Sequence, residues 1–129
     1  RLICKKAAKR ATPNERKDFE RLAKEFRKAA KDKDDALFRK ADKEFNDLTV
    51  IASRNEFAAA AMSPLHGMSR RFWFGNFHHF AGVTEMANLH AAVASAIAKG
   101  DETDAGDALD QLIDCVENIT RKTIRDSGS

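Results

Sequence analysis

Residues 83–100 read VTEMANLHAAVASAIAKG, a stretch in which apolar side chains recur at every third or fourth position. At about 100° per residue, these side chains form one face of an α-helix. His90 lies near the centre of that face, where a leucine would be expected. A buried imidazole needs partners for two ring nitrogens, so His90 is a satisfied core histidine, a metal ligand or a contact for a bound molecule.

Length and composition predict one all-α domain that covers residues 1–129. The chain contains two prolines and an alanine-rich set of apolar positions, which favours helix over sheet. A chain of 129 residues is long enough to bury a single hydrophobic core. No apolar run approaches the roughly 18 residues of a membrane span, and no signal-peptide pattern opens the chain. We therefore expect a soluble, cytoplasmic protein that does not contact a membrane.

Start and stop signals divide the chain into an antiparallel bundle of about six helices. The capping box Thr12-Pro13-Asn14-Glu15 predicts that the second helix begins at Pro13. Thr84 is the predicted cap of the fifth helix, and Gly100 is its predicted end. The aromatic segment 72–82 is expected to be irregular. The predicted helices span residues 1–10, 13–31, 36–53, 55–69, 84–100 and 101–125, with Pro64 and Gly67 interrupting the fourth.

A second unusual feature is a polar pair at the edge of the apolar face of the helix predicted over 36–53. Asp42 and Asn46 lie one turn apart there. A carboxylate beside this face and the inward-pointing His90 would be costly to bury unless they met each other, a cation or a polar ligand. Alternatively, Asp42 turns toward solvent and Asn46 is simply exposed.

The charges of the chain are divided between its two parts. Residues 1–33 contain thirteen Lys and Arg against five acids, a net charge of +8, whereas the rest carries ten against fifteen, a net charge of −5. The basic part is either a nucleic-acid footprint or the solvated face of two helices. Cys4 and Cys115 match the spacing of no metal knuckle or redox pair, so both are expected to be reduced thiols.

Four motifs in order give the chain a resemblance to a known family. They are DKEFN at residues 42–46, ASRN at 52–55, HAAVASAIAKGD at 90–101 and ALDQLI at 108–113. In sequence and spacing these motifs resemble the FCD domain, the C-terminal effector-binding domain of FadR-type GntR transcription regulators. The resemblance covers nearly all 129 residues. It implies a helical domain that binds a small organic effector, a carboxylate in many members, and that is not an enzyme.

The resemblance also implies where a metal would lie. Many such domains hold a divalent metal, zinc or nickel, with an aspartate and three histidines, and these positions fall on Asp42, Asn46, His90 and Leu112. Two of the four ligands are therefore replaced, at Asn46 and Leu112, which leaves Asp42 and His90 as metal ligands of poor affinity. Substitute ligands are available in the sequence at His66, His78 and His79.

By the same resemblance, Asp42, Asn46, His90 and Arg71 line the effector cavity. Arg71 falls on the apolar side of the fourth predicted helix, where a guanidinium can clamp a carboxylate, and Arg70 is its substitute if the helical phase changes at Gly67. Both arginines could instead form a basic pair at a frayed helix end. The family implies a homodimer that contacts DNA through an upstream winged-helix domain, which is absent from this sequence.

Two other classes of function are open. One is a helical-bundle metal-binding protein or metalloenzyme that uses Asp42, His90 and a loop histidine, although the inward Glu-x-x-His pairs of such bundles are missing here. The other is a nucleic-acid-binding module that uses the basic first two helices.

Overall fold

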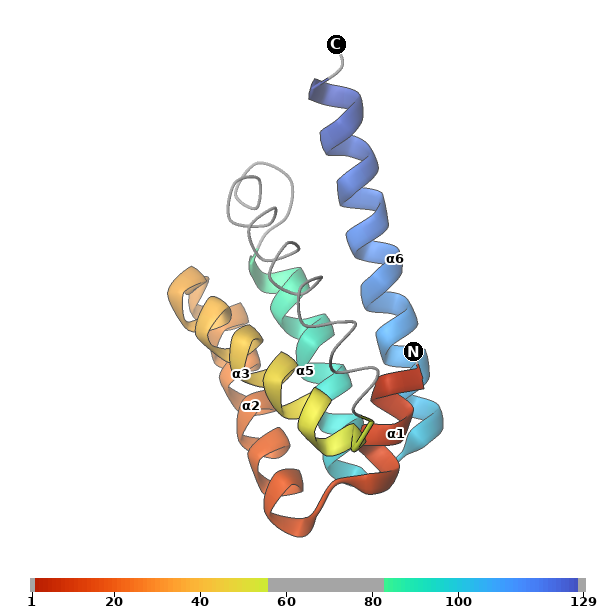
Figure 1. Cartoon of the computed structure of the whole chain (residues 1–129). Coiled ribbons are helices and arrows are strands. Elements are labelled where there is room, and N and C mark those ends of the chain that lie inside the picture. Colours follow the sequence, from red (N-terminus) through yellow and green to blue (C-terminus); the bar gives the residue numbers. More distant parts are fainter. Residues whose placement is uncertain (1, 56–82, 128–129) are drawn as a thin grey trace.

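Five α-helices make up the part of the chain that the computed structural model describes, residues 2–55 and 83–127, and these residues contain no strand. The helices are α1 (Leu2–Arg10), α2 (Pro13–Asp32), α3 (Asp35–Ser53), α5 (Val83–Lys99) and α6 (Glu102–Ser127) (Figure 1). The all-α bundle predicted from the sequence is confirmed. The predicted fourth helix and the aromatic segment 72–82 lie outside the described residues.

Short-range hydrogen bonds define where α2 begins. The Thr12 hydroxyl accepts from the Glu15 amide at 3.2 Å, and the Glu15 carboxylate accepts from the Thr12 amide at 2.9 Å. This is the predicted capping box. Burial by itself would raise the pKa of the Glu15 carboxyl, but the hydrogen bond from the Thr12 amide and the contact with Arg54 outweigh it and hold the pKa below its usual value.

The ends of α2 and α5 also follow local rules. Lys33 adopts a left-handed conformation with φ of 51° after α2, and the side chain of Asp34 then accepts from the Leu37 amide at 3.0 Å to start α3. Gly100 ends α5 with φ of 74°, and the Asp101 side chain caps α6 by accepting from the Asp104 amide at 2.9 Å. These boundaries agree with the predicted ones to within a residue or two.

The prediction for Thr84 is wrong. Helix α5 begins at Val83, so Thr84 lies inside its first turn. Its hydroxyl donates instead to the Ala30 carbonyl near the C-terminal end of α2, at 2.8 Å. A neighbouring helix competes successfully for this hydroxyl, because helix α2 brings an unsatisfied carbonyl within its reach.

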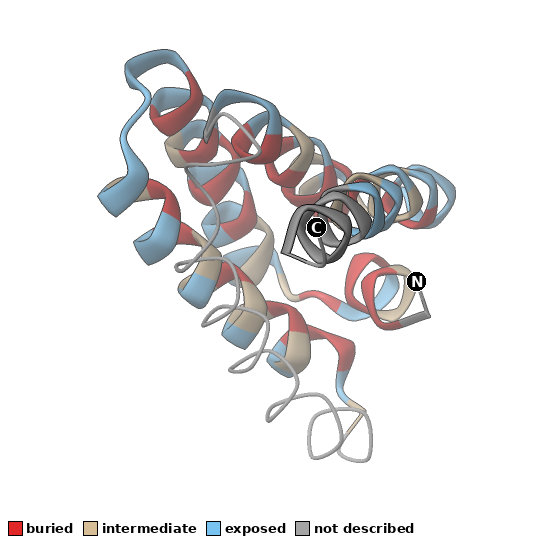
Figure 2. Cartoon of the chain, turned by 90° about the horizontal axis from the view of Figure 1, so that it is seen from above, coloured by how far each residue is buried: buried red, intermediate tan, exposed pale blue. Residues whose placement is uncertain are grey.

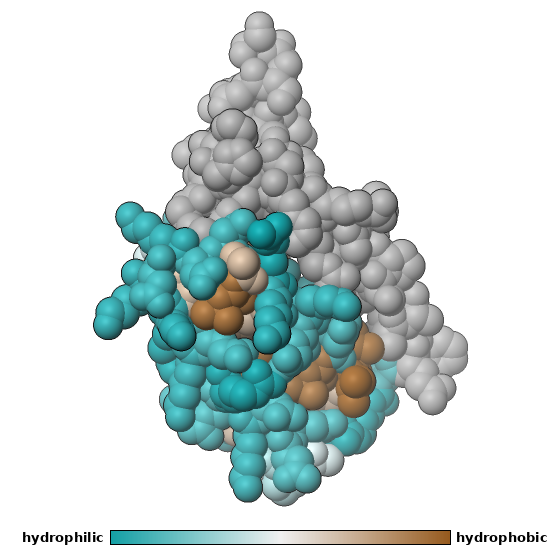
Figure 3. Space-filling view, turned by 90° about the vertical axis from the view of Figure 1, so that its left-hand side faces the viewer, coloured by the Kyte–Doolittle hydropathy of each residue, from teal (hydrophilic) through white to brown (hydrophobic). Residues whose placement is uncertain are grey.

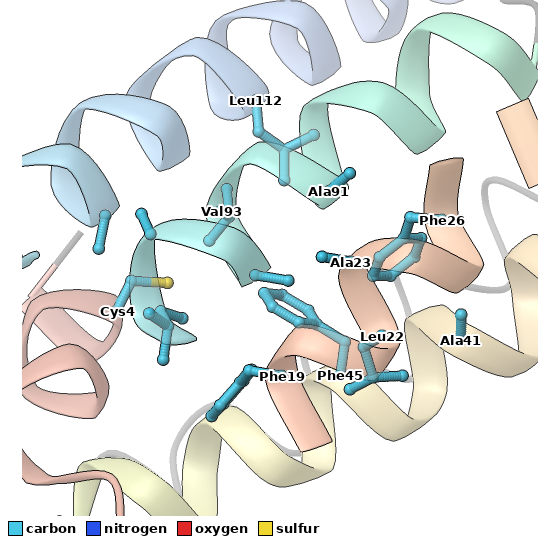
Figure 4. Close-up of a cluster of buried hydrophobic side chains, with 14 of the residues drawn as sticks. Cys4, Phe19, Leu22, Ala23, Phe26, Ala41, Phe45, Ala91, Val93 and Leu112 are labelled. Atoms are coloured by element: carbon cyan, nitrogen blue, oxygen red, sulfur yellow. The ribbon is translucent and has the colours of Figure 1, made fainter. Parts of the chain in front are cut away.

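The core lies between α2 and α5, which form the most extensive contact among the described helices. Helix α2 contributes large side chains, with Phe19, Leu22 and Phe26 fully buried. Four of the buried residues of helix α5 are alanines, whose small side chains let the two axes approach closely. Figure 4 shows Ala91 and Val93 of α5 close to the large side chains of α2, and Figure 2 shows the buried faces of the helices turned toward the centre.

Aromatic contacts fix α3 against α2. The ring centroid of Phe45 lies 6.0 Å from that of Phe19 and 5.8 Å from that of Phe26, both in edge-to-face geometry. Such pairs add about 0.5–1.5 kcal/mol beyond the burial of their area. The rotation of α3 about its axis is thereby set, and this rotation decides which of its residues face α5.

Arginines satisfy backbone carbonyls at the C-terminal ends of three helices. Arg16 donates to the Ala8 carbonyl of α1 at 2.8 Å and to the Ile97 carbonyl of α5 at 3.0 Å. Arg10 donates to the Ser53 carbonyl of α3 at 2.9 Å. All three helix ends meet at the lower end of the bundle in Figure 1. The cationic side chains also complement the negative ends of the helix dipoles.

None of the described helices combines the length and the apolarity that crossing a bilayer requires.

The bridge formed by Arg16 can be tested by substitution. Arg16→Ala leaves two carbonyls without their charged donor, so we expect the free energy of unfolding to fall by about 2 kcal/mol in urea denaturation. The matched control is Lys17→Ala, because Lys17 is the exposed neighbour and should change the free energy by less than about 0.5 kcal/mol. Equal effects of the two substitutions would contradict a bridging role for Arg16.

Candidate functional site

The structure brings Asp42 and His90 together. Nε2 of His90, on α5, lies 3.1 Å from Oδ1 of Asp42, on α3. The His90 side chain is only 10% exposed, and the Asp42 side chain 16%. The sequence left open whether Asp42 meets His90 or turns toward solvent, and in the structure its carboxylate meets the imidazole. His90 is buried in the core, as predicted.

The second ring nitrogen of His90 is held by its own helix. Nδ1 lies 2.7 Å from the carbonyl oxygen of Met86, one turn earlier. A carbonyl oxygen can only accept, so Nδ1 carries a proton and donates it. A neutral imidazole carries only one N–H, so in that form Nε2 faces the Asp42 carboxylate without a proton. The contact with Asp42 is favourable when Nε2 carries a second proton, or when a cation or a hydrogen-bond donor joins the two groups.

Three phenylalanine rings enclose the imidazole. Its centroid lies 5.1 Å from that of Phe26, 5.1 Å from that of Phe38 and 6.1 Å from that of Phe45. Phe38 and Phe45 present edge-to-face geometry, at 89° and 75°. The rings fix the orientation of His90 and lower the local dielectric, so the interaction with Asp42 is stronger than it would be in water.

The role of these three phenylalanines around His90 was not predicted from the sequence. A signal was present in the sequence, because Phe38, Asp42 and Phe45 are spaced four and three residues apart and so share one face of α3. Once Asp42 is expected to face His90, the same spacing places both phenylalanines beside the imidazole. Phe26 comes from α2, and its contact depends on the close packing of α2 against α5.

The other predicted cavity residues have different surroundings. Asn46 is half-buried one turn after Asp42, and Leu112 of α6 is buried in the hydrophobic core. Arg71, its substitute Arg70 and the histidines at 66, 78 and 79 lie outside the described residues. The described part of the predicted site therefore consists of the Asp42–His90 contact with Asn46 beside it on α3.

The donors found among residues 2–55 and 83–127 do not fit a tightly held metal. Among the described residues, no group of three or more His, Cys, Asp and Glu side chains converges. Asp42 and His90 supply two donors, the amide of Asn46 is a weak neutral ligand, and Leu112 supplies none. Zinc sites in proteins have at least three protein ligands, and catalytic sites keep the fourth position for water or substrate.

The two cysteines are free thiols, as the sequence predicted. Burial raises the pKa of the Cys4 thiol to about 11. Burial also raises the pKa of the Cys115 thiol, and the carboxylate of Glu85, 3.7 Å from its sulfur, raises it further. Both groups are therefore poor nucleophiles and poor metal ligands near neutral pH.

These features define an all-helical domain with a histidine–carboxylate pair in its core. The family model of the FCD domain matches residues 1–114, so the chain belongs to the FCD domain family. This match confirms the predicted resemblance to the C-terminal domains of FadR-type GntR regulators. No curated protein and no solved structure matches the chain.

A double-mutant cycle can test the Asp42–His90 contact. When Nε2 carries a proton, we expect Asp42→Ala to lower the free energy of unfolding by about 1–3 kcal/mol, because it leaves the buried Nε2 donor without its acceptor. His90→Leu should cost less, since leucine is apolar and the Asp42 side chain keeps 16% of its surface exposed to water. The double substitution should cost less than the sum of the two. Additive effects in urea denaturation would show that the two side chains do not interact.

Thiol reactivity tests the surroundings of the cysteines. At pH 8 we expect iodoacetamide to modify Cys115 before Cys4, and both more slowly than in urea, because only the thiolate reacts. Glu85→Gln removes the nearby negative charge and should speed the modification of Cys115. Glu102→Gln, at an exposed position on α6, is the control and should leave the rate unchanged. Faster modification of Cys4, followed by mass spectrometry, would be inconsistent with its burial.

Proposed function

We propose that this chain is the ligand-sensing domain of a FadR-type GntR transcription regulator and that a small organic effector binds beside Asp42 and His90. The Asp42–His90 contact carries this proposal. Met86 and the three phenylalanines hold the imidazole in place. The polar groups of the pair that remain to meet a ligand are Nε2 of His90 and the Asp42 carboxylate. In a neutral ring, Nε2 has no proton to donate to the carboxylate, so the two acceptors face each other. A buried pair of acceptors is better suited to binding a ligand than to packing alone.

The chemistry of these groups favours an effector that carries both hydroxyl and carboxylate groups. The Asp42 carboxylate accepts hydrogen bonds, and the amide of Asn46 both donates and accepts, so a hydroxyl group suits this side of the site. A carboxylate needs a cationic partner, a role we assign to Arg71 on the basis of the sequence. Small hydroxy acids and sugar acids have this combination of groups.

The mechanism we propose is a shift between two arrangements of the bundle. An effector that binds one arrangement more tightly raises the population of that arrangement, and the size of the shift is set by the difference between its affinities for the two arrangements. Arg10 ties the first helix to α3, and Arg16 ties it to α5, so a displacement between the two helices that carry the site also reaches α1. In this proposal an upstream winged-helix domain binds DNA, the protein is a homodimer, and the chain catalyses no reaction.

A metal-binding protein is the second candidate. One observation favours it, since Nδ1 of His90 hydrogen-bonds a backbone carbonyl while Nε2 faces a carboxylate, as in metal-bound histidines. With two donors, zinc or nickel would bind weakly. Metal analysis of protein purified without chelator or affinity tag should therefore find much less than one equivalent. A stoichiometric, tightly held metal would favour this second function.

A thermal-shift screen tests the proposed function. Small carboxylates, hydroxy acids, sugar acids and amino acids are screened with and without divalent metals, and a ligand at 100 times its dissociation constant adds about 2.7 kcal/mol. We expect the shift to disappear in Asp42→Ala and His90→Leu while both variants remain folded by circular dichroism. The control is Asp47→Ala, which changes an exposed acid of the same helix and should keep the shift. A full shift in both site variants would contradict the proposed site.

A further inference from the structure

One face of α2 is a row of cationic side chains. Its members are all exposed and lie at spacings of seven, three, one and three residues, which keeps them on one side of the helix: Lys17, Lys24, Arg27, Lys28 and Lys31. We call these five residues the α2 basic stripe. At about 1.5 Å per residue, the stripe is roughly 21 Å long.

No described acid lies within ion-pair distance of the stripe. None of its five residues forms an ion pair with a described residue, whereas Arg21 of the same helix pairs with Glu25 and with Glu44 of α3. Three acids of α2 lie three or four residues from members of the stripe, namely Glu20, Glu25 and Asp32, and Glu25 pairs with Arg21. The stripe therefore carries five cations, with no ion pair to a described residue, against two neighbouring acids, Glu20 and Asp32, that also form none.

Another helix, α6, carries an excess of acidic over basic side chains. The exposed acids of α6 include Glu102, Asp104, Asp107 and Asp114. Helix α6 packs against α5 and α1, and α5 separates it from α2 (Figure 1). The side of the molecule on which α2 and α3 lie is mostly hydrophilic around two apolar patches (Figure 3). This separation of charge orients the α2 face toward a polyanion.

We propose that the α2 basic stripe binds the phosphate backbone of duplex DNA. A duplex presents one negative charge per about 1.7 Å of its axis, so several phosphates lie within reach of a row of this length. Four of the five groups are lysines, which act as point charges on flexible stems and need no fixed base geometry. The contact is therefore independent of sequence. This proposal rests on the proposed function for the presence of nearby DNA. The regulator would hold this domain next to its operator and so raise the effective concentration of DNA at the stripe.

The salt dependence of DNA binding tests this proposal. Fluorescence anisotropy of the chain with a labelled 20-base-pair duplex should show binding at low salt, with a slope of log K against log salt of about −3 to −4. In Lys24→Gln/Lys28→Gln, two phosphate contacts are lost, so the magnitude of the slope should fall by about 2. Duplexes of unrelated sequence should give the same values. Glutamine has nearly the helix propensity of lysine, so the fold should be unchanged by circular dichroism.

A matched control separates the stripe from the overall charge. Lys9→Gln/Lys99→Gln removes the same charge at exposed positions on α1 and α5 and should keep the wild-type slope. No binding at low salt, or equal losses in the two double variants, would overturn the proposal. Self-association of the wild type without DNA, abolished by Lys24→Gln/Lys28→Gln, would assign the stripe to the acidic helix α6 of a second copy instead. The effector screen does not involve α2's outer face, so its result is independent.

Discussion

The close contact between α2 and α5 is the constraint on which the rest of the structure depends. It is possible because α5 presents alanines where α2 presents phenylalanine and leucine, so that large and small side chains interleave. Phe26 thereby reaches the imidazole of His90. Phe26 also contacts Phe45, which sets the rotation of α3 and turns Asp42 toward His90. A larger residue on the inner face of α5 would separate the helices and disrupt this geometry.

Local patterns predicted most of the fold and part of the site. The period of the apolar residues placed His90 inside, and the capping box located the start of α2, because both depend on neighbours within one or two turns. The bridge from Arg16 to α5 could not be predicted, since it joins residues 81 positions apart. The capping role predicted for Thr84 was wrong for a related reason, because its hydroxyl donates to a carbonyl of α2 and does not cap α5.

The site combines a buried polar contact with an apolar neighbour. Asp42 and His90 lie opposite each other, the Met86 carbonyl holds the imidazole ring, and Leu112 lies in the apolar core. A leucine supplies no metal donor and adds buried hydrophobic area. Among the described residues, Nε2 of His90 and the Asp42 carboxylate are therefore the polar groups of this site that a hydrogen-bond donor or a cation could join.

Among the described residues, side-chain contacts to backbone carbonyls tie the helices together near both ends of the bundle. At one end, Arg10 and Arg16 attach directly to the backbones of α1, α3 and α5. At the opposite end, the Thr84 hydroxyl of α5 donates to the Ala30 carbonyl of α2. The arginine contacts end on main-chain carbonyls, so they do not depend on which side chains α1, α3 and α5 carry there. Substitutions of those side chains would therefore leave the attachment in place, and the spacing of the three helix ends depends on two arginines.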